Sequence, residues 1–310
     1  MLRDEVLDLL FEEELTQKEL TSKLNSSRSR ISEVLSRLEK QGFIVRRKVS
    51  QRTVVVSLNH SRTLRVGILR STEYVHVVST LHELEKKIPF RLKVYDNSLE
   101  ALKELMTGKE DIIASPLISG YFFFLIDKFI RPIAGVATGG AGLIKRKNHG
   151  RIGTTPLSRM DKDSREFRGY EQVYYKSIED ILSAYRKGEI DAAQIWEPFL
   201  SMNEGINSPP KGTCCCLFTK GKPNRSTSQF LERYIDSVEN GISGARRLEV
   251  SGLMSDVLGV RASAVNKSID SYLFTTLISE KDLKNQIASF GLPLVKEVES
   301  FLEGCSKVSV

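Results

Sequence analysis

The first sixty residues alternate hydrophobic and polar positions with two different periods. Apolar side chains recur at helical spacing in three successive segments, 2–10, 16–24 and 27–41. Two runs rich in β-branched residues, 43–49 and 53–58, then flank a short polar turn. The pattern predicts three helices followed by a β-hairpin.

Polar residues between these segments indicate where the helices begin and end. Thr16, followed three residues later by Glu19, fits a capping box, in which each side chain binds the other residue's backbone. Ser26 or Ser27 can cap the third helix, and Gly42 can end it. Three helices and a hairpin in so short a segment indicate a winged helix-turn-helix domain.

Beyond a short polar linker, the pattern changes to buried strands that alternate with amphipathic helices. Strands are predicted at 64–69, 90–95 and 111–115, and they are separated by helices at 73–87 and 98–108. Strands connected through helices at this spacing predict parallel βαβ units, and therefore an α/β domain.

One helix–strand unit occurs twice, at 97–117 and at 176–199. In each copy a serine lies at the start of a helix, a glycine ends the helix, and an aspartate three residues later begins a short apolar strand. Gly108 and Gly188 are expected to adopt left-handed caps. The repeat predicts two similar α/β lobes.

The ends of the repeated strands predict a cleft between the lobes. Ligands of open α/β sheets bind outside the carboxyl ends of the strands, so Ser115–Pro116 is expected to face Trp196–Glu197–Pro198. The Gly-rich segment 131–147 and the segment 212–220 suit two crossovers between the lobes.

The charge of the chain is concentrated in one short block. The net charge is +7, and residues 25–62 hold nine Lys or Arg against two acidic residues, so the remaining chain sums to zero. A solvated charged surface would rarely gather the whole imbalance in one segment. A basic block beside a neutral body is typical of a nucleic-acid-binding module.

Composition narrows the class of protein further. The chain is 40% hydrophobic and 27% charged, as in soluble globular proteins, and its longest apolar stretch, 121–126, is far shorter than the roughly 20 residues of a membrane span. The N-terminus has acidic residues and no cationic region before an apolar block, so no secretory signal is expected. We therefore expect a cytoplasmic protein without a membrane partner.

Cysteine and histidine spacing predicts no metal site and no cofactor. Three of the four cysteines are consecutive, which matches no zinc template and allows no relaxed disulfide among them. The four histidines show no metal-binding spacing. Reduced thiols are expected.

The second and third predicted helices and the hairpin carry a family pattern within 1–58. Its positions are Thr16, Glu19, Leu20, Ser27, Ser29, Ser32, Leu35, Leu38, Glu39, Gly42 and Ile44. In this pattern the chain resembles winged-helix regulators of the MarR and TrmB type. The resemblance implies that the third helix enters the major groove of double-stranded DNA and that the hairpin follows the backbone or the minor groove.

The positive charge of this domain favours binding to DNA. The alternative is a domain that mediates only protein contacts, but such a surface has no need of four cations on its hairpin. The expected DNA-binding residues are Ser27, Arg28, Ser29, Arg30, Ser32, Glu33, Ser36, Arg37, Arg46, Arg47, Lys48 and Arg52.

The second lobe carries a further motif, G-x-x-D-A-x-x-x-W-x-P, as Gly188, Asp191, Ala192, Trp196 and Pro198. With this motif, the repeat and the order of elements, 64–245 resembles solute-binding proteins of the nitrate/sulfonate/taurine and thiamine-pyrimidine group. The resemblance implies the type II periplasmic-binding-protein fold.

The expected fold class is therefore α/β, with a small N-terminal winged-helix domain and a two-lobed periplasmic-binding-protein fold. The segment 246–310 is expected to be helical and to pack on the first lobe or form an oligomer contact. The expected boundaries are 1–58 for the DNA-binding domain, 59–63 for the linker and 64–310 for the ligand-binding domain, with lobe 1 at about 64–135 and 217–310 and lobe 2 at about 145–212.

The cysteine run also resembles a segment of an enzyme family. Fungal pyrimidine synthases of thiamine biosynthesis, built on the same fold, carry a G-CCCFC segment, matched here by Gly212, Cys214, Cys215, Cys216 and Phe218. The fourth cysteine of that segment is absent, and no histidine follows the third strand where those enzymes consume one. We expect a reduced, half-buried run, with iron or redox sensing as an alternative.

Candidate ligand contacts stand at the strand-to-helix junctions, where free N–H groups and the positive end of the helix dipole favour an anion. Trp196 can stack on a flat ring and Tyr121 can close its other side, whereas local capping or core packing is the alternative for each candidate. The expected ligand-binding residues are Arg70, Ser71, Thr72, Ser115, Pro116, Ser119, Tyr121, Gly139, Gly140, Thr154, Thr155, Trp196 and Glu197.

Together these features predict a homodimeric, one-component transcription regulator. Its second domain would close on a small anionic or heteroaromatic effector and change the affinity of the first domain for DNA. The alternative is a pyrimidine-synthase-like enzyme fused to a DNA-binding domain, but no catalytic residues are expected.

Overall fold

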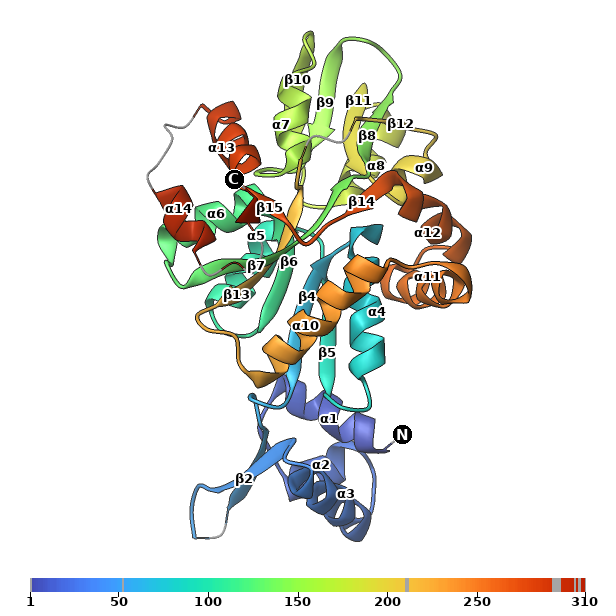
Figure 1. Cartoon of the computed structure of the whole chain (residues 1–310). Helices are drawn as coiled ribbons and strands as arrows, with labels where there is room; N and C mark the ends of the chain where they lie inside the picture. The colour runs from blue at the N-terminus through green and yellow to red at the C-terminus, as the bar shows by residue number, and fades with distance from the viewer. Residues whose placement is uncertain are drawn as a thin grey trace.

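The computed structural model describes residues 2–51, 53–209, 212–291, 297–303, 305 and 308–309. A small head at the N-terminus is joined to a larger body that contains two large sheets, one above the other (Figure 1). None of the helices in the described ranges combines the length and apolar character of a transmembrane segment.

The head is a winged helix-turn-helix unit. Thr16 and Glu19 form the predicted capping box, and Ser27 caps the third helix by accepting a hydrogen bond from the Arg30 N–H. Leu20, Ile31 and other apolar side chains pack into one core beneath the hairpin. The elements are α1 (Leu2–Glu12), β1 (Leu15–Thr16), α2 (Gln17–Lys23), α3 (Arg28–Lys40), β2 (Ile44–Lys48) and β3 (Val54–Leu58), with strand order β1-β3-β2.

Lobe 1 of the body is built on a six-stranded mixed sheet in the order β14-β7-β13-β6-β4-β5. Its β4 pairs in parallel with both β5 and β6, as the βαβ pattern predicts, while β13 runs antiparallel to its neighbours. The strands are β4 (Leu64–Leu69), β5 (Phe90–Tyr95), β6 (Ile112–Pro116), β7 (Ile130–Gly139), β13 (Cys215–Lys220) and β14 (Tyr272–Phe274).

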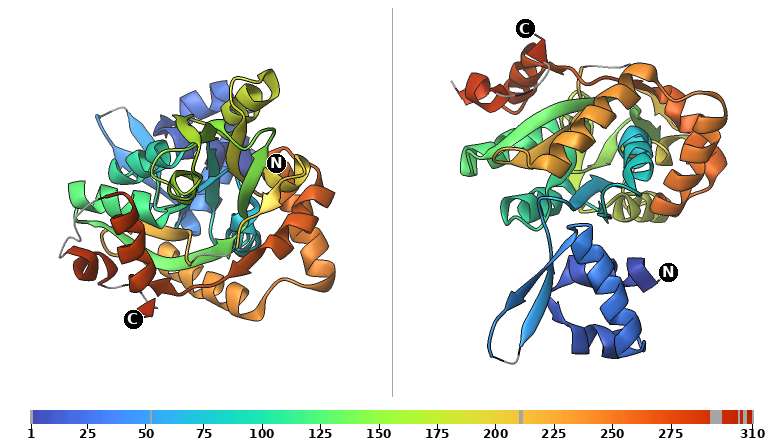
Figure 2. Two further views of the ribbon diagram at one scale, coloured as in Figure 1. Left: turned by 90° about the horizontal axis from the view of Figure 1, so that it is seen from above. Right: turned by 60° about the horizontal axis from the view of Figure 1, so that its bottom comes forward.

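Helices cover both faces of this sheet, each with its own apolar core. Figure 2 shows the C-terminal helices spread along the outside of the body. One face carries α4 (Val75–Leu84), α10 (Arg225–Asn240), α11 (Gly244–Leu258) and α12 (Ala262–Ser268), and the other carries α5 (Ser98–Met106), α6 (Leu117–Ile126), α13 (Glu280–Ser289) and α14 (Glu297–Leu302). The C-terminal segment, whose position the sequence left open, therefore packs on lobe 1.

The remaining short elements of lobe 1 mark its edges. They are the 3-10 turns η1 (Thr72–Tyr74) and η2 (Ile269–Ser271) and the paired strands β15 (Ile278–Ser279) and β16 (Val308–Ser309).

Lobe 2 is a five-stranded sheet in the order β10-β9-β11-β8-β12. Its strands are β8 (Ala141–Lys145), β9 (Gly150–Thr154), β10 (Tyr170–Tyr174), β11 (Ala192–Trp196) and β12 (Ile206–Asn207), and its helices are α7 (Arg159–Arg165), α8 (Ile178–Lys187) and α9 (Phe199–Met202). The sheet is parallel at β10, β9 and β11, so those strands end on one side, which faces lobe 1.

Two crossovers join the lobes, one through Gly139–Gly140 and one that leads into β13. Both glycines have positive φ, +93° and +65°, a backbone conformation that side chains disfavour. A Cβ at Gly139 would meet the carbonyl of Ser271, and one at Gly140 would meet the ring of Tyr272. Only glycine fits this close approach of the crossover to β14.

Candidate ligand-binding site and DNA-binding surface

A cavity of about 430 Å³ lies between the two lobes. This volume lies within the range of small-molecule sites. Lobe 1 provides one wall, from the ends of β4, β5, β6 and β13, and lobe 2 provides the other. The lining residues are Leu69, Ser71, Glu73, Tyr74, Asp96, Asn97, Ser98, Leu99, Glu100, Pro116, Gly139, Ala141, Thr155, Pro156, Ser158, Met160, Tyr174, Tyr175, Lys176, Trp196, Cys214, Cys215 and Tyr272.

The end of β4 is held in place by Ser71. Its Oγ accepts a hydrogen bond from the Glu73 N–H (3.2 Å), which caps η1, and it also pairs with the hydroxyl of Tyr272 (3.0 Å). This cap fixes the turn η1, which places Glu73 and Tyr74 in the wall of the cavity.

Glu73, Tyr74, Cys214 and Cys215 form a buried polar corner of this wall. The hydroxyl of Tyr74 donates to Cys215 Sγ (3.4 Å), and the Sγ atoms of Cys214 and Cys215 are 3.7 Å apart. Burial raises the pKa of Glu73 to about 7, although the proximity of Cys215 and the charge of Arg159 act in the opposite direction. Burial also raises the pKa of the Cys215 thiol well above its usual value.

The corner is the one place in the described residues where three or more His, Cys, Asp or Glu side chains could hold a metal ion. Its ligand atoms, from Glu73, Cys214 and Cys215, lie within 4.8 Å of one another.

Lobe 2 contributes aromatic and basic side chains to the opposite wall. Trp196 is half-buried, and its indole N–H donates to the carbonyl of Arg70 in lobe 1 (2.7 Å). Tyr174, Tyr175 and Lys176 follow one another at the end of β10. The wall therefore offers flat apolar faces together with one cation.

Glu197 fastens the two lobes together. Its carbonyl accepts hydrogen bonds from the Thr72 N–H (3.3 Å) and from Ser71 Oγ (3.3 Å), both in lobe 1. Its carboxylate accepts from Ser271 Oγ (3.0 Å) and from Ser201 Oγ (2.7 Å). With its buried side chain spanning the junction, Glu197 holds the lobes in a closed arrangement.

The expected ligand-binding residues fall into three places. The first group lines the cavity: Ser71, Pro116, Gly139, Thr155 and Trp196. The second lies at contacts next to the cavity or across the lobes: Arg70, Thr72, Ser119, Gly140 and Glu197. The third is buried beside the strands without lining the cavity: Ser115, Tyr121 and Thr154.

Tyr121 differs most from its expected position. It lies on α6 against Phe124 and Phe301, with its ring centroid 5.3 Å from that of Phe301. The helix α6 is apolar on nearly all sides, so the core between the sheet and α14 takes up the ring, and the cavity does not. Tyr121 therefore packs in the core, which was an alternative to ligand binding for each candidate.

Sequence reasoning missed several lining residues, although the rule that it used could have found them. Asp96 and Asn97 directly follow β5, and Tyr175 and Lys176 directly follow β10. Applying the carboxyl-end rule to every parallel strand, and not only to the repeated ones, gives these positions. Glu73 belongs to the segment 70–73 that follows β4, of which only Arg70, Ser71 and Thr72 were expected to contact a ligand.

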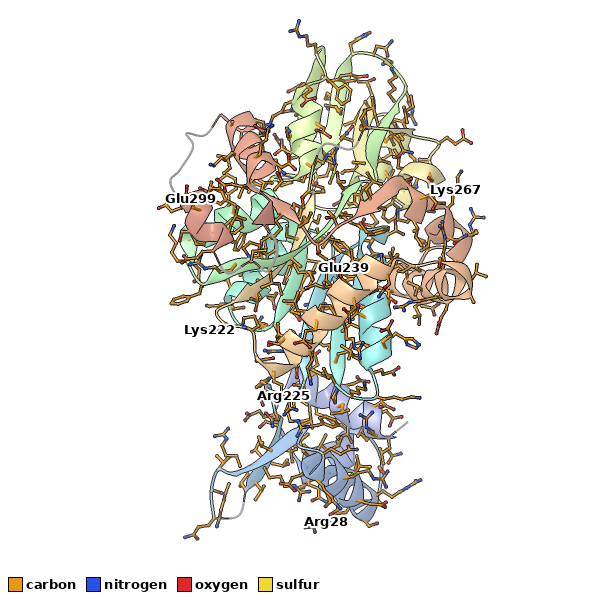
Figure 3. All side chains as sticks on the ribbon, viewed as in Figure 1. Arg28, Lys222, Arg225, Glu239, Lys267 and Glu299 are labelled. Atoms are coloured by element: carbon orange, nitrogen blue, oxygen red, sulfur yellow. The ribbon has the colours of Figure 1, made fainter. Side chains whose placement is uncertain are left out.

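The exposed face of α3 forms the candidate DNA-binding surface. Arg28, Ser29 and Arg30 are exposed at its first turn, and Arg28 lies at the end of the head farthest from the body (Figure 3). Arg28, Arg30 and Lys48 make no ion pair with the other described residues. These three cations are therefore available to phosphates or bases.

Other cations of the head are engaged within it. Arg37 pairs with Glu33 (3.1 Å), Arg46 with Glu39 (3.1 Å), and Arg47 with Glu14 (2.8 Å). Ser27 is occupied as the cap of α3, Ser32 is half-buried, and Ser36 accepts from Arg46 at 3.5 Å. Arg52 lies outside the described residues.

The family comparison assigns the head. The MarR family model matches residues 5–52. The head is therefore a MarR-type DNA-binding domain, which agrees with its helices and hairpin. No curated protein matches the chain by sequence.

Several solved structures that are similar to the body are ligand-binding proteins. The ligand-binding component of an ABC-type import system from Staphylococcus aureus, with zinc bound, has a TM-score of 0.64 at 12% identity over 78% of this chain and 99% of that protein. The alkanesulfonate-binding protein of Xanthomonas axonopodis pv. citri, bound to MOPS, has a TM-score of 0.58 at 13% identity over 78% and 94%. The periplasmic aliphatic sulphonate-binding protein of Escherichia coli has a TM-score of 0.56 at 13% identity over 80% and 94%. The body therefore has the periplasmic-binding-protein fold.

Proposed function

We propose that the protein is a one-component transcription regulator whose MarR-type head binds operator DNA and whose body binds a small effector. The observation that carries the proposal is the cavity of about 430 Å³, lined by both lobes, on the same chain as the head. An effector that fits only the closed lobes would stabilise that state, and it can change DNA affinity only by its preference between states.

A small anionic or heteroaromatic metabolite from the cytoplasm is the proposed effector. Trp196 and Tyr175 offer flat faces for a ring, and Lys176 offers a cation for an anionic group. Two of the similar structures are sulfonate-binding proteins, which favours the anionic part of this class.

A chain of contacts between the head and the cavity supports the coupling. Arg91 pairs with Glu12 of the head (2.8 Å) and with Glu110 of the body (2.8 Å). Tyr95 donates to the same Glu110 oxygen (2.8 Å), and the next residue, Asp96, lines the cavity. An effector that contacts Asp96 would therefore act on the same strand that holds α1. In a homodimer, this would alter the spacing of the two heads on half-sites.

DNA binding is tested with the full chain and duplexes selected from a random-sequence library. Replacing Arg28 and Arg30 by Ala should weaken binding at least tenfold and reduce the slope of log K against log salt concentration by about 1 to 2, because up to two phosphate contacts are lost. Lys23→Ala is the matched control, since it removes a cation of the head that pairs with Glu13 (2.8 Å) and lies outside the expected DNA-binding residues. Equal affinities for wild type and the double variant would contradict the proposed interface.

Effector binding is tested by thermal shift with a panel of small sulfonates, aromatic acids and aminopyrimidines. A compound that stabilises the protein should also change its affinity for the selected duplex, without being consumed. Trp196→Ala should lose the stabilisation, whereas Tyr121→Phe, which changes a ring in the core, should keep it. A compound that stabilises all three proteins equally does not bind at this cavity.

A further inference from the structure

The polar corner of the cavity wall has the geometry of a cation site. Glu73, Cys214 and Cys215 are each 5% exposed or less, and their ligand atoms lie within 4.8 Å of one another. The two sulfurs are 3.7 Å apart. Two thiolates bound to one tetrahedral zinc ion at about 2.3 Å each would be separated by about 3.8 Å, so the sulfurs already have nearly this spacing.

An unsatisfied oxygen points to a missing partner in this corner. Glu73 Oε1 is buried and has no hydrogen-bond partner among the described residues. Burying a carboxyl oxygen without a partner costs free energy, and native structures seldom leave such an atom unpaired. A cation between this oxygen and the two sulfurs would supply the partner.

The backbone around β13 explains why two neighbouring cysteines face the same side. Cys214 precedes the strand, and its N–H and carbonyl are bound by Ala137 (3.0 Å) and Leu117 (2.9 Å). Cys215 begins the strand and packs in the core beside the cavity, whereas Cys216 packs in the core on the opposite face of the sheet. The run of three thiols is therefore divided into a pair in the cavity wall and one residue behind the sheet.

We propose that Cys214, Cys215 and Glu73 bind one thiophilic divalent cation of the zinc class, with a fourth position open to the cavity. Two thiolates and one carboxylate are ligands that zinc accepts, and an open fourth position is typical of zinc sites that also bind a small molecule. Binding releases the two thiol protons to solvent, together with the proton of the Glu73 carboxyl where that group is protonated, and changes no oxidation state. This site goes beyond the proposed function, since it requires neither DNA nor an organic effector.

Cobalt is the spectroscopic probe, used on the full chain after treatment with a chelator and a thiol reductant. Co²⁺ should produce a thiolate-to-cobalt charge-transfer band that saturates at one equivalent, and Zn²⁺ should abolish the band. In weak buffer, binding of Zn²⁺ should release about two to three protons per cation, two from the thiols and the remainder from the Glu73 carboxyl where it is protonated. Wild-type protein that gives no band and no proton release at several equivalents would overturn the proposal, whatever the variants do.

Single substitutions should show which side chains bind the cation. Cys214→Ser and Cys215→Ser should each weaken cation binding at least 100-fold, and Glu73→Gln should weaken it at least tenfold with the thiolate band retained. Cys216→Ser is the matched control, because it is equally buried in the same run but lies behind the sheet, and it should bind like wild type. A band that is lost with Cys216→Ser and retained with Cys215→Ser would also overturn the assignment.

The outcome is independent of the regulator proposal. Failure to bind cobalt or zinc leaves the DNA and effector measurements untouched, and those measurements can fail while the cation still binds.

Discussion

The same helix–strand unit is built once in each lobe, and the two copies differ where the strand ends. In lobe 1, Gly108 (φ +77°) follows the end of α5 and the chain leads into β6, and in lobe 2, Gly188 (φ +74°) follows the end of α8 and the chain leads into β11. The helices begin with caps from Asn97 and Ser177. The two units therefore share their local geometry from cap to cap.

An aspartate in each copy fastens its strand to the neighbouring strand. The Asp111 N–H donates to the Arg65 carbonyl (2.9 Å), and its carboxylate accepts from the Arg65 N–H (2.8 Å). Asp191 makes the same two bonds with Arg151, at 2.8 and 3.1 Å. This part of the repeat holds neighbouring strands together, and both lobes need it.

The strands deliver different residues at their carboxyl ends. In lobe 1, β6 ends in Ser115 and Pro116, which are buried against the crossover and α6. In lobe 2, β11 ends in Trp196 and is followed by Glu197, and both make hydrogen bonds to the other lobe. The shared positions therefore hold the fold, whereas the positions that differ close the cavity.

The largest expected effect is a difference in the free energy of unfolding between variants of the two aspartates. Asp111→Ala should lower the free energy of unfolding by about 3 kcal/mol, because it leaves the mostly buried guanidinium of Arg65, now paired at 2.9 Å, without its partner. Asp191→Ala should cost clearly less, since its partner Lys147 is exposed. Urea unfolding of both variants measures the difference. Equal losses would show that the two copies do not differ in burial as described.

A buried histidine of lobe 1, His76, should make the free energy of unfolding depend on pH. Burial, with the charge of Arg246 as a smaller cause, lowers the pKa of His76 to about 4, and its Nδ1 lies 3.0 Å from Ser237 Oγ. Above pH 6.5 both folded and unfolded states are neutral at this residue. As the pH falls from 6.5 toward 4, only the unfolded state gains the proton, so up to about 3 kcal/mol of stability is lost. His76→Asn should flatten this part of the unfolding curve, and an unchanged slope would assign it elsewhere.

The ends of the helices could be predicted from the sequence because the residues that cap them are close to one another in the chain. The capping box at Thr16, the cap at Ser27 and the left-handed Gly188 each depend on a few neighbouring residues, and all three are confirmed. The fold class is also confirmed, since hydrophobic periodicity and the repeat record which faces are buried.

The site was less predictable because it is made by elements far apart in the chain. Glu73 reaches the thiols of 214–215 only through the pairing of β13 with β6, and no spacing in the sequence records this contact. The aromatic character of Tyr121 suits either a cavity or a core, and only the packing of Phe301 decides between them. The DNA-binding residues and the effector contacts stay predictions.

Removing one donor tests the contacts that close the cavity. Trp196→Phe keeps an aromatic ring but loses the bond to the Arg70 carbonyl, so the closed arrangement should lose about 1 kcal/mol. Small-angle scattering should show a larger radius of gyration if the lobes then open, and effector affinity should fall by about fivefold. Tyr175→Phe, which lines the same wall, is the control. An equal response from both variants would remove Trp196 from this role.

The smallest expected difference concerns the two helix caps. Gly108 and Gly188 have nearly the same positive φ, and an added Cβ would meet no atom within 4 Å at Gly108 and only Arg146, at 3.6 Å, at Gly188. Backbone strain alone should therefore decide the cost, so Gly108→Ala and Gly188→Ala should each lower the free energy of unfolding by about 1 kcal/mol. Urea unfolding that gives equal losses would support one shared scaffold. A markedly larger loss in one lobe would mean that this cap also carries a contact specific to its own copy, and the division between shared and divergent positions would have to move toward the helix.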